Sequence, residues 1–252
     1  MRPLAVVLLA AGKGTRMKSE LPKVLHRLAG RPLVFYPLDL ALALEARKIA
    51  IVVGHQAERV KRTVRRGYTQ RRVEFVLQEK QEGTGHAVLQ AKTALRGFTG
   101  DVLILSGDIP LLTPATIRKF LRQHRQSSPG LSLVTCDLEN PTGYGRCLVD
   151  ARGRLREIVE EKDATPEQRL IREINAGIYL MDAKLLWWAL SRIGKDNAQG
   201  EMYLTDIAGV VRRRGKTIRV FKAADSHEVM GINTRAELAR ANRLYKKIKT
   251  AR

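Results

Sequence analysis

Residues 4 to 23 read LAVVLLAAGKGTRMKSELPK, and this stretch decides how the rest of the chain is interpreted. Its first six residues, Leu4 to Leu9, form an unbroken apolar run. Such a run is typical of a strand that is buried on both faces of a mostly parallel sheet. We therefore expect a central strand here, followed directly by residues at the edge of the sheet where ligands bind.

The turn that follows this strand combines small residues with two cations: Ala10, Ala11, Gly12, Lys13, Gly14, Thr15 and Arg16. Small residues let backbone N–H groups approach an anion closely, and the cations can reach the same anion. Two commoner glycine motifs do not fit. A Walker loop needs four residues between its first Gly and a Gly-Lys pair, and a dinucleotide fingerprint needs a third glycine where Met17 stands. The turn therefore predicts a phosphate-binding loop of another kind.

Beyond this loop, strand-like and helix-like segments alternate along the chain. This is the pattern of an α/β fold, a three-layer Rossmann-like sandwich with a mostly parallel mixed sheet. Since ligands bind beyond the carboxyl ends of such strands, the phosphate-binding loop, Gln78 and Asp108 are expected to converge on one edge of the sheet. The expected strands are 49–53, 73–77, 102–105 and 174–180, and the expected helices are 33–44, 58–66, 83–95, 184–193, 202–213 and 237–249.

The composition fits a globular protein, since the chain has 252 residues and 44% of them are hydrophobic. We expect one domain over residues 1–252, with 237–252 as a C-terminal helical tail. No segment approaches the ~20 apolar residues that span a bilayer. The N-terminus imitates a signal peptide, but cleavage there would destroy the phosphate-binding loop. The two cysteines, Cys136 and Cys147, are interpreted as core residues rather than a disulfide, which predicts a cytoplasmic protein.

The formal net charge of +21 suggests nucleic acid or an anionic surface as a partner. The basic residues, however, lie on helix-like segments where they alternate with apolar residues such as Val60, Val64 and Phe120, as they do on solvated helix faces. No zinc-ligand spacing, RNA-binding motif or aromatic interleaving accompanies them. We therefore expect no specific nucleic-acid partner and no membrane partner. A basic nucleic-acid-binding protein on an inactive scaffold is the alternative.

The loop is part of a longer signature, LAAGxGTRM followed by Pro22-Lys23, and seven further motifs follow it in order. With these motifs the chain resembles the sugar nucleotidyltransferases, and in particular the uridylyltransferase half of the bifunctional N-acetylglucosamine-1-phosphate uridylyltransferases. The resemblance covers nearly the whole chain. The motifs are QEKQEGTGHA at 78–87, SGDIPLL at 106–112, NPTGYGR at 140–146, IVEEKDAT at 158–165, EINAGIY at 173–179, NAQGEMYLTD at 197–206 and GINTR at 231–235.

The resemblance implies transfer of UMP from UTP to N-acetylglucosamine 1-phosphate, with release of pyrophosphate and with Mg²⁺ as cofactor. It assigns catalysis to Arg16, Lys23 and Asp108. Asp108 and Asn233 would hold the metal, and a carboxylate with an amide oxygen suits Mg²⁺, which prefers oxygen ligands. From the residues alone, Asp108 also fits a turn and Asn233 a helix cap. A nucleotidyltransferase that acts on another sugar 1-phosphate is the alternative within the same class.

The resemblance also implies two binding subsites. The implied nucleotide-binding residues are Leu9, Ala10, Ala11, Gly12, Lys23, Gln78, Gly83 and Thr84. The implied sugar-binding residues are Ser106, Gly107, Asp108, Gly145, Glu160, Asn175 and Asn233. Ser106 departs from relatives, in which the residue two before the aspartate is often aromatic. The shorter strands expected at 131–136, 145–149 and 155–159 are interpreted as a small β-rich lid over the sugar site.

The implied reaction needs no general base, because a phosphate oxygen of a sugar 1-phosphate is already largely ionised near neutral pH. None of the five histidines therefore has to be catalytic. The bifunctional relatives continue into a hexapeptide-repeat acetyltransferase, whereas this sequence reaches Arg252 without such a repeat. We therefore infer neither the acetyltransferase activity nor the trimer that depends on that part, and the oligomeric state stays open.

Overall fold

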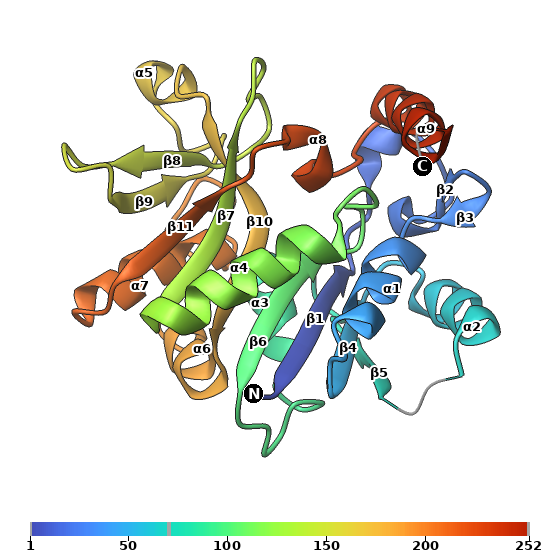
Figure 1. Ribbon diagram of the computed structural model, residues 1–252, viewed down its shortest axis with the longest axis horizontal. Helices are drawn as coiled ribbons and strands as arrows, with labels where there is room; N and C mark the ends of the chain where they lie inside the picture. The colour runs from blue at the N-terminus through green and yellow to red at the C-terminus, as the bar shows by residue number, and fades with distance from the viewer. Residues whose placement is uncertain (1, 70–71, 251–252) are drawn as a thin grey trace.

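Strand β1, Leu4–Ala10, lies near the centre of a nine-stranded mixed sheet in the computed structural model (Figure 1), which describes residues 2–69 and 72–250. The other strands of this sheet are β4 Lys48–Val53, β5 Val73–Leu77, β6 Asp101–Ser106, β7 Leu131–Asp137, β8 Arg146–Val149, β9 Leu155–Val159, β10 Glu173–Asp182 and β11 Ile218–Lys222. The strand order is β11-β7-β10-β6-β1-β4-β5, with β8 and β9 attached beside β10. β1 therefore has neighbours on both sides, as its continuous apolar run predicts.

Along the path from β11 to β5, four of the six neighbouring pairs run parallel. β1 pairs in parallel with β4 and β6, β4 with β5, and β7 with β11. β10 differs, because it runs antiparallel to both β6 and β7. The predicted mostly parallel mixed sheet is confirmed, and the carboxyl ends of β1, β4, β5 and β6 meet at one edge.

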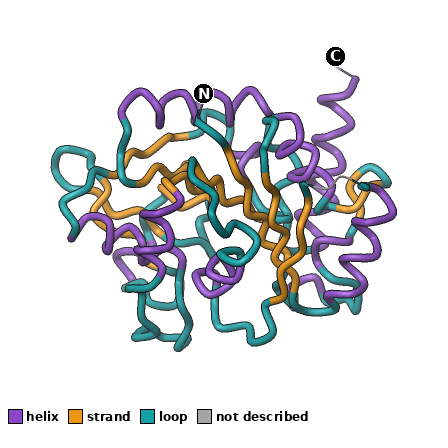
Figure 2. The backbone as a smooth tube through the Cα atoms, turned by 90° about the horizontal axis from the view of Figure 1, so that it is seen from below, coloured by secondary structure: helices purple, strands orange, loops and turns teal. Residues whose placement is uncertain are grey.

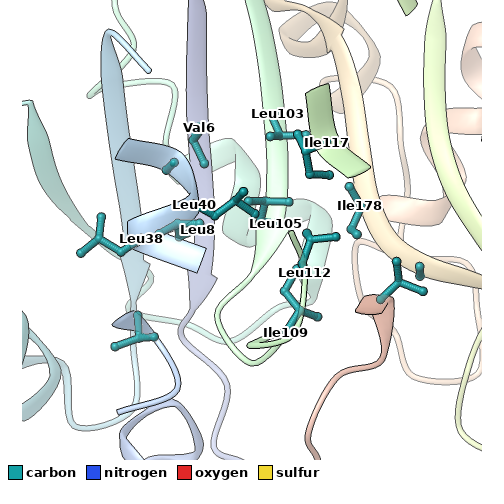
Figure 3. Close-up of a cluster of buried hydrophobic side chains, with 14 of the residues drawn as sticks. Val6, Leu8, Leu38, Leu40, Leu103, Leu105, Ile109, Leu112, Ile117 and Ile178 are labelled. Atoms are coloured by element: carbon teal, nitrogen blue, oxygen red, sulfur yellow. The ribbon is translucent and has the colours of Figure 1, made fainter. Parts of the chain in front are cut away.

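Helices cover both faces of the sheet and complete the three layers (Figure 2). One face carries α1 Phe35–Ala43, α2 Ala57–Gly67 and α4 Pro114–Ser127, and the other carries α3 Thr84–Gln90, α6 Ala183–Leu190 and α7 Ile207–Arg213. Successive residues of a strand point to opposite faces, so β1 contributes to two cores. Val6 and Leu8 lie in the core under α1, α2 and α4 (Figure 3), whereas Ala5 and Val7 lie in the core under α3, α6 and α7.

β8 and β9 form a hairpin that joins the main sheet where Arg146 pairs with Ile174 of β10. The prediction that 131–136 belongs to a lid with this hairpin is wrong. That segment lies in β7, where every residue from Leu131 to Cys136 is buried in the main sheet between β10 and β11. A continuous buried run is typical of an interior strand, so its apolar character is a better guide than the short strands that follow it.

Helix boundaries differ from the sequence prediction at several ends. α3 ends at Gln90 rather than at 95, and turns continue to Gly97. The helix expected at 202–213 divides into a 3₁₀ turn at Leu204–Asp206 and α7. The helix α4 has no range among the predicted helices, although Phe120 lies on one of the helix-like basic segments. Besides the 3₁₀ turns, five short elements also have no predicted counterpart: β2 Arg27–Leu28, β3 Arg31–Pro32, α5 Pro166–Arg169, α8 Ser226–Val229 and β11.

The C-terminal helix α9, Arg235–Thr250, packs against the rest of the chain. Leu238 and Tyr245 contact a small core that contains Ala241 together with Leu28, Leu33 and Ile232. The helical spacing of Leu238, Ala241 and Tyr245 fits a face that contacts either a partner or the domain itself, and in the structure this face packs against the domain. Residues 251 and 252 of the expected tail lie outside the described residues. Neither α9 nor any other described helix is long and apolar enough to cross a bilayer.

Both cysteines are core residues, as predicted. Cys136 and Cys147 are buried and unpaired. Burial raises the pKa of the Cys136 thiol to about 12 and that of Cys147 further still. Thiols of this kind stay protonated at neutral pH and behave as small apolar side chains.

Candidate active site

The carboxyl ends of β1, β5 and β6, at the upper edge of the sheet in Figure 1, border a cleft of about 290 Å³. Gly107 N–H donates to the Leu9 carbonyl at 2.9 Å, and Gln78 N–H donates to the Val53 carbonyl at 2.7 Å, so the strand ends are tied together. The predicted convergence on one edge is therefore confirmed. Ten of the predicted site residues line the cleft: Leu9, Ala10, Ala11, Gly12, Lys23, Gln78, Gly83, Thr84, Ser106 and Asp108.

Two glycines with different tasks shape the phosphate-binding loop after β1. A Cβ at Gly12 would meet no atom within 4 Å, so the loop leaves open space there. Gly14 has φ +64, and a Cβ there would lie 2.5 Å from the Cβ of Lys23, so glycine is needed for this close approach. Within the described residues, the backbone N–H groups from Gly12 to Thr15 donate to no protein oxygen. These N–H groups are free to bind an anion.

Beside this loop, two oxygen-bearing side chains face two cations. Lys23 forms an ion pair with Asp108, and its Nζ also donates to Asn233 Oδ1 at 3.1 Å. Arg16 donates to the same Asn233 oxygen at 2.9 Å. Only 4% of the Asp108 surface is exposed, so the ion pair with Lys23 compensates this carboxylate for its lost hydration. The structure therefore brings together four predicted site residues that are far apart in the sequence.

The start of α9 separates the two interpretations of Asn233. The N-cap is Thr234, whose hydroxyl accepts from Glu237 N–H at 3.1 Å, while the Glu237 carboxylate accepts from Thr234 N–H at 2.9 Å. This reciprocal arrangement is a capping box. The Asn233 side chain is therefore not needed as a cap and points to Lys23 and Arg16 instead.

The segment before α9 holds this cluster in place. Ile232 N–H donates to the Asp108 carbonyl at 2.9 Å, and Gly231 packs so closely that a Cβ there would lie 3.3 Å from the Asp108 carboxylate. Arg235 donates to the carbonyls of Met17 and Lys18 at 3.1 and 3.0 Å, which ties α9 to the end of the phosphate-binding loop. Arg235 is absent from the predicted site residues, although the GINTR motif contains it.

The oxygen donors of the cluster suit a hard divalent cation. The Asp108 carboxylate and Asn233 Oδ1 both face one positive centre, the Lys23 ammonium. Mg²⁺ binds through oxygen and commonly takes one or two protein ligands together with phosphate oxygens and water. The two side chains therefore fit a Mg²⁺ site, provided that Lys23 gives up part of its contact with them.

The other end of the cleft is built around Gln78 and the start of α3. The Gln78 side chain is nearly buried, and its Nε2 donates to the Gly83 carbonyl at 3.1 Å. Gly83 has φ +102, and a Cβ there would lie 2.6 Å from the Met202 carbonyl, so the packing of the chain itself requires glycine. The Thr84 hydroxyl accepts from Leu204 N–H at 3.0 Å. Gly83 and Thr84 thus join the wall of the cleft to a distant segment of the chain.

Gly145, Glu160 and Asn175 form a second group beside β10. The Gly145 carbonyl accepts from Asn175 N–H at 2.9 Å, and a Cβ at Gly145 would lie 3.5 Å from Glu160 Oε2. The pairing of β10 with β7 shifts register directly after Asn175. A Cβ at Gly177, within this irregular part, would lie 4.0 Å from Ser106 Oγ. The β10 segment next to this group therefore approaches Ser106 of the cleft, whereas Gly145, Glu160 and Asn175 are not among the residues that line it.

Glu160 is partly buried beside other acids. Burial raises the pKa of its carboxyl, and the carboxylates of Asp206, Asp163 and Glu201 raise it further. The Thr205 hydroxyl, which donates to Glu160 Oε1 at 3.0 Å, acts in the opposite direction. A partly buried acid whose pKa is raised by burial and by neighbouring carboxylates is typical of functional positions.

The loop before β8 reaches back to the phosphate-binding loop. A Cβ at Gly143 would lie 3.2 Å from an Arg16 guanidinium nitrogen. Gly143 N–H donates to the Glu161 carboxylate at 2.9 Å, and the same carboxylate pairs at 2.8 Å with the buried Arg146. Arg146 and Glu161 are absent from the predicted site residues. They hold in place the loop that carries Gly145. In the sequence, the signal that points to them is their membership of two motifs, NPTGYGR for Arg146 and IVEEKDAT for Glu161.

Comparison with known proteins identifies relatives over nearly the whole chain. Residues 6–176 match the family model of the MobA-like NTP transferase domain. The chain is 51% identical over 242 residues to the bifunctional protein GlmU of Anaeromyxobacter dehalogenans (strain 2CP-C) and 51% identical over 244 residues to that of Geobacter metallireducens (strain ATCC 53774 / DSM 7210 / GS-15). These alignments cover 96% of this chain but 49% and 50% of the relatives. The chain thus spans about half the length of the curated relatives it matches.

The fold has a close likeness among solved structures. A UDP-glucose pyrophosphorylase complexed with UDP-glucose superimposes with a TM-score of 0.77 at 18% sequence identity, over 98% of this chain and 99% of that chain. At this identity the likeness bears on the fold alone, and it agrees with the mixed α/β architecture. The family model, in contrast, matches more than half of the sequence. The chain therefore belongs to the family of MobA-like NTP transferase domains, the nucleotidyltransferases.

Proposed function

We propose that this protein, as one domain over residues 1–252, transfers UMP from UTP to N-acetylglucosamine 1-phosphate and uses Mg²⁺. The products are UDP-N-acetylglucosamine and pyrophosphate. The observation that carries the proposal is the cluster of Asp108, Asn233, Lys23 and Arg16 beside a loop with free N–H groups. The shared motifs and 51% identity to proteins named GlmU support the choice of substrates. We place the reaction in the cytoplasm, where a reducing environment suits two unpaired buried cysteines.

The reaction is a substitution at the α-phosphorus of UTP. A phosphate oxygen of the sugar 1-phosphate forms the new P–O bond, and the bond to the β-phosphate breaks as pyrophosphate leaves. Because the second pKa of a phosphate monoester is about 6, the nucleophile is already ionised at neutral pH. The protein therefore has to align two anions and neutralise their charge rather than remove a proton.

Asp108, Lys23 and Arg16 are the catalytic residues of this proposal. Asp108 and Asn233 would hold Mg²⁺, which when bound neutralises charge on phosphate oxygens. Lys23 and Arg16 place two further cations within 3.1 Å of Asn233. Cations that are already positioned stabilise developing charge at the α-phosphate and the pyrophosphate without a reorganisation step.

We expect UTP to be preferred over ATP and GTP by about 100-fold in kcat/KM, the discrimination that pocket shape commonly supplies. The nucleotide would occupy the cleft with its phosphates at the loop after β1 and its base at Gln78, Gly83 and Thr84. The cleft is small, and the packing of Gly83 against Met202 prevents its wall from yielding to a purine. The measurement is pyrophosphate release with each nucleoside triphosphate at fixed N-acetylglucosamine 1-phosphate and Mg²⁺. Faster turnover with a purine nucleotide would contradict the proposal.

The sugar phosphate would lie between the two groups of residues. Gly145, Glu160 and Asn175 would contact the sugar, with Ser106 and Gly107 at the border of the cleft, and the β8–β9 hairpin would act as a small lid. A different sugar 1-phosphate is the alternative, because nothing in these contacts recognises an acetamido group. Replacing N-acetylglucosamine 1-phosphate by glucose 1-phosphate or N-acetylgalactosamine 1-phosphate in the same assay decides between them.

Glu160→Gln should raise the Tm at neutral pH and weaken binding of the sugar phosphate. Because the pKa of Glu160 is raised in the folded protein, the ionised carboxylate destabilises the fold above the pKa of the unfolded chain. The gain should disappear as the pH falls below that value, where both states are protonated. Thermal unfolding across pH and the KM for the sugar phosphate test this, with the exposed Glu157→Gln as control. A lower Tm at neutral pH would contradict the raised pKa, and an unchanged KM would contradict the sugar contact.

A further inference from the structure

The two polar atoms of the Gln78 amide are in different situations. The nitrogen Nε2 donates to the Gly83 carbonyl at 3.1 Å and lies 3.2 Å from His86 Nδ1. The oxygen Oε1 bonds no described residue, although only 4% of Gln78 is exposed. Because Gln78 lines the cleft, this oxygen is a free acceptor at the place where a ligand would bind.

The direction of the Gln78 amide follows from its neighbours. The carbonyl oxygen of Gly83 can only accept, so the nitrogen of the amide must face it. His86 Nδ1 must then accept the second N–H of the same nitrogen. A neutral imidazole that accepts at Nδ1 carries its proton at Nε2.

Gln90 completes a chain of hydrogen bonds along α3. Its amide nitrogen stands 2.8 Å from His86 Nε2, and two donors cannot bond each other. A half-turn of the Gln90 amide exchanges its nitrogen and oxygen. The half-turn gives up a longer contact of 3.3 Å with the His86 carbonyl. It gives the Nε2–H of His86 an acceptor, and it fixes the tautomer that Gln78 requires.

We propose that His86 and Gln90 position Gln78 with its oxygen towards the nucleobase, and that this tether makes the cleft select uracil over cytosine. The inference rests on the proposed function, since it takes UTP as the substrate. Uracil has an N–H at N3, which the Gln78 oxygen can accept. Cytosine has a lone pair at N3, which the same oxygen repels. A site whose buried polar group matches one base in this way rejects the other strongly.

His86→Leu should lower the ratio of kcat/KM for UTP over CTP by about tenfold, close to the worth of one hydrogen bond. The substitution removes one of the two acceptors that hold the Gln78 nitrogen, so only the bond to Gly83 still opposes a half-turn that points this nitrogen at the base. The loss should lie in the KM for UTP, and kcat should stay within about twofold, since the Asp108 cluster is untouched. His86 and Gln90 are positioning residues, because neither would contact the substrate.

Three further variants distinguish positioning from packing. His86→Gln offers a carbonyl oxygen to Gln78 and should recover part of the selectivity. Gln90→Leu keeps the His86 imidazole but removes the acceptor that holds its proton on Nε2. The ratio of kcat/KM for UTP over CTP should therefore fall by a smaller factor of about three. Lys92→Leu, an exposed residue close after α3, should keep the wild-type ratio.

The tether can also be tested in the free protein, without any turnover. ¹⁵N NMR of the His86 ring should show the proton on Nε2 in the wild type and a mixture of tautomers in Gln90→Leu. A folded His86→Leu protein with the wild-type UTP to CTP ratio would overturn the proposal, and so would a proton on Nδ1 of His86. If the wild type does not use UTP, the proposed function fails instead, and the NMR result still decides whether the tether exists.

Discussion

Asp108→Ala should slow UMP transfer about a thousandfold and leave the affinity for UTP within a few fold. The Asp108 carboxylate is nearly buried and faces the Lys23 ammonium. The other members of the cluster, Asn233, Lys23 and Arg16, carry no carboxylate that could take its place. Its proposed task is to hold Mg²⁺ against the phosphate oxygens, and neutralisation of such charge is worth several kcal/mol. At about 1.4 kcal/mol per tenfold in rate, a loss of ~4 kcal/mol corresponds to the expected factor.

Steady-state kinetics and equilibrium UTP binding on the same preparation of Asp108→Ala test this prediction. Asp108→Asn keeps the shape and one oxygen but removes the charge, so its rate should lie between those of the alanine variant and the wild type. Glu58→Ala on α2 is the matched control, because it removes an exposed carboxylate that forms an ion pair with Lys61. If Asp108→Ala keeps more than about a tenth of the wild-type kcat, a loss under ~1.4 kcal/mol, the assignment of the metal ligand is wrong.

Lys23→Met should lower kcat by about 10²–10³-fold, the usual effect of removing one positioned group that stabilises developing charge. Methionine keeps most of the length of the side chain and removes the ammonium. That ammonium contacts both Asp108 and Asn233, and Gly14 brings its backbone to the phosphate-binding loop. Loss of the cation also leaves the buried Asp108 without its ion pair, so we expect lower thermal stability as well.

Kinetics at saturating Mg²⁺, with circular dichroism to show that each variant is folded, separate these two effects of Lys23→Met. Lys23→Arg keeps the charge in a different geometry and should retain more activity than the methionine variant. Lys61→Met on α2 removes a lysine from an exposed ion pair and should leave kcat unchanged. Wild-type activity in a folded Lys23→Met protein would contradict a role for this cation in the transition state.

The sequence predicts the parts of the site that depend on strand ends. The apolar run at β1 and the residues that follow β5 and β6 place the loop, Gln78 and Asp108 on one edge, because parallel strands end on the same side of a sheet. The resemblance to a known family adds Asn233, whose distance in sequence from Asp108 hides the contact that both make with Lys23. The structure then shows why Asn233 is available, since Thr234 and Glu237 make the cap.

The sequence predicts the antiparallel half of the sheet less well. β7 and the hairpin of β8 and β9 follow one another with similar short apolar runs, and only the pairing partners tell that β7 lies between β10 and β11. β11 is missing from the prediction because its alternating IRVFK pattern is half exposed at the edge of the sheet. Strand order is set by contacts between distant segments, and local periodicity does not contain it.

The supporting residues of the site were also beyond reach of the sequence alone. Arg235 acts through two backbone carbonyls of the loop, and Arg146 acts through a glutamate that also holds Gly143. In a chain with 46 Lys and Arg, nothing in the composition sets these two apart from solvated cations. His86 is similar, because its role depends on the direction of a neighbouring amide.

The central claim is that the Asp108 cluster transfers UMP to a sugar 1-phosphate, and ³¹P NMR of the reaction tests it most directly. The sample contains purified protein, UTP, N-acetylglucosamine 1-phosphate and Mg²⁺, and a parallel sample contains Asp108→Ala. We predict that the wild type forms UDP-N-acetylglucosamine and pyrophosphate in equal amounts, whereas the variant forms neither over the same time. No sugar nucleotide from the wild type, or equal rates from the two proteins, would contradict the account.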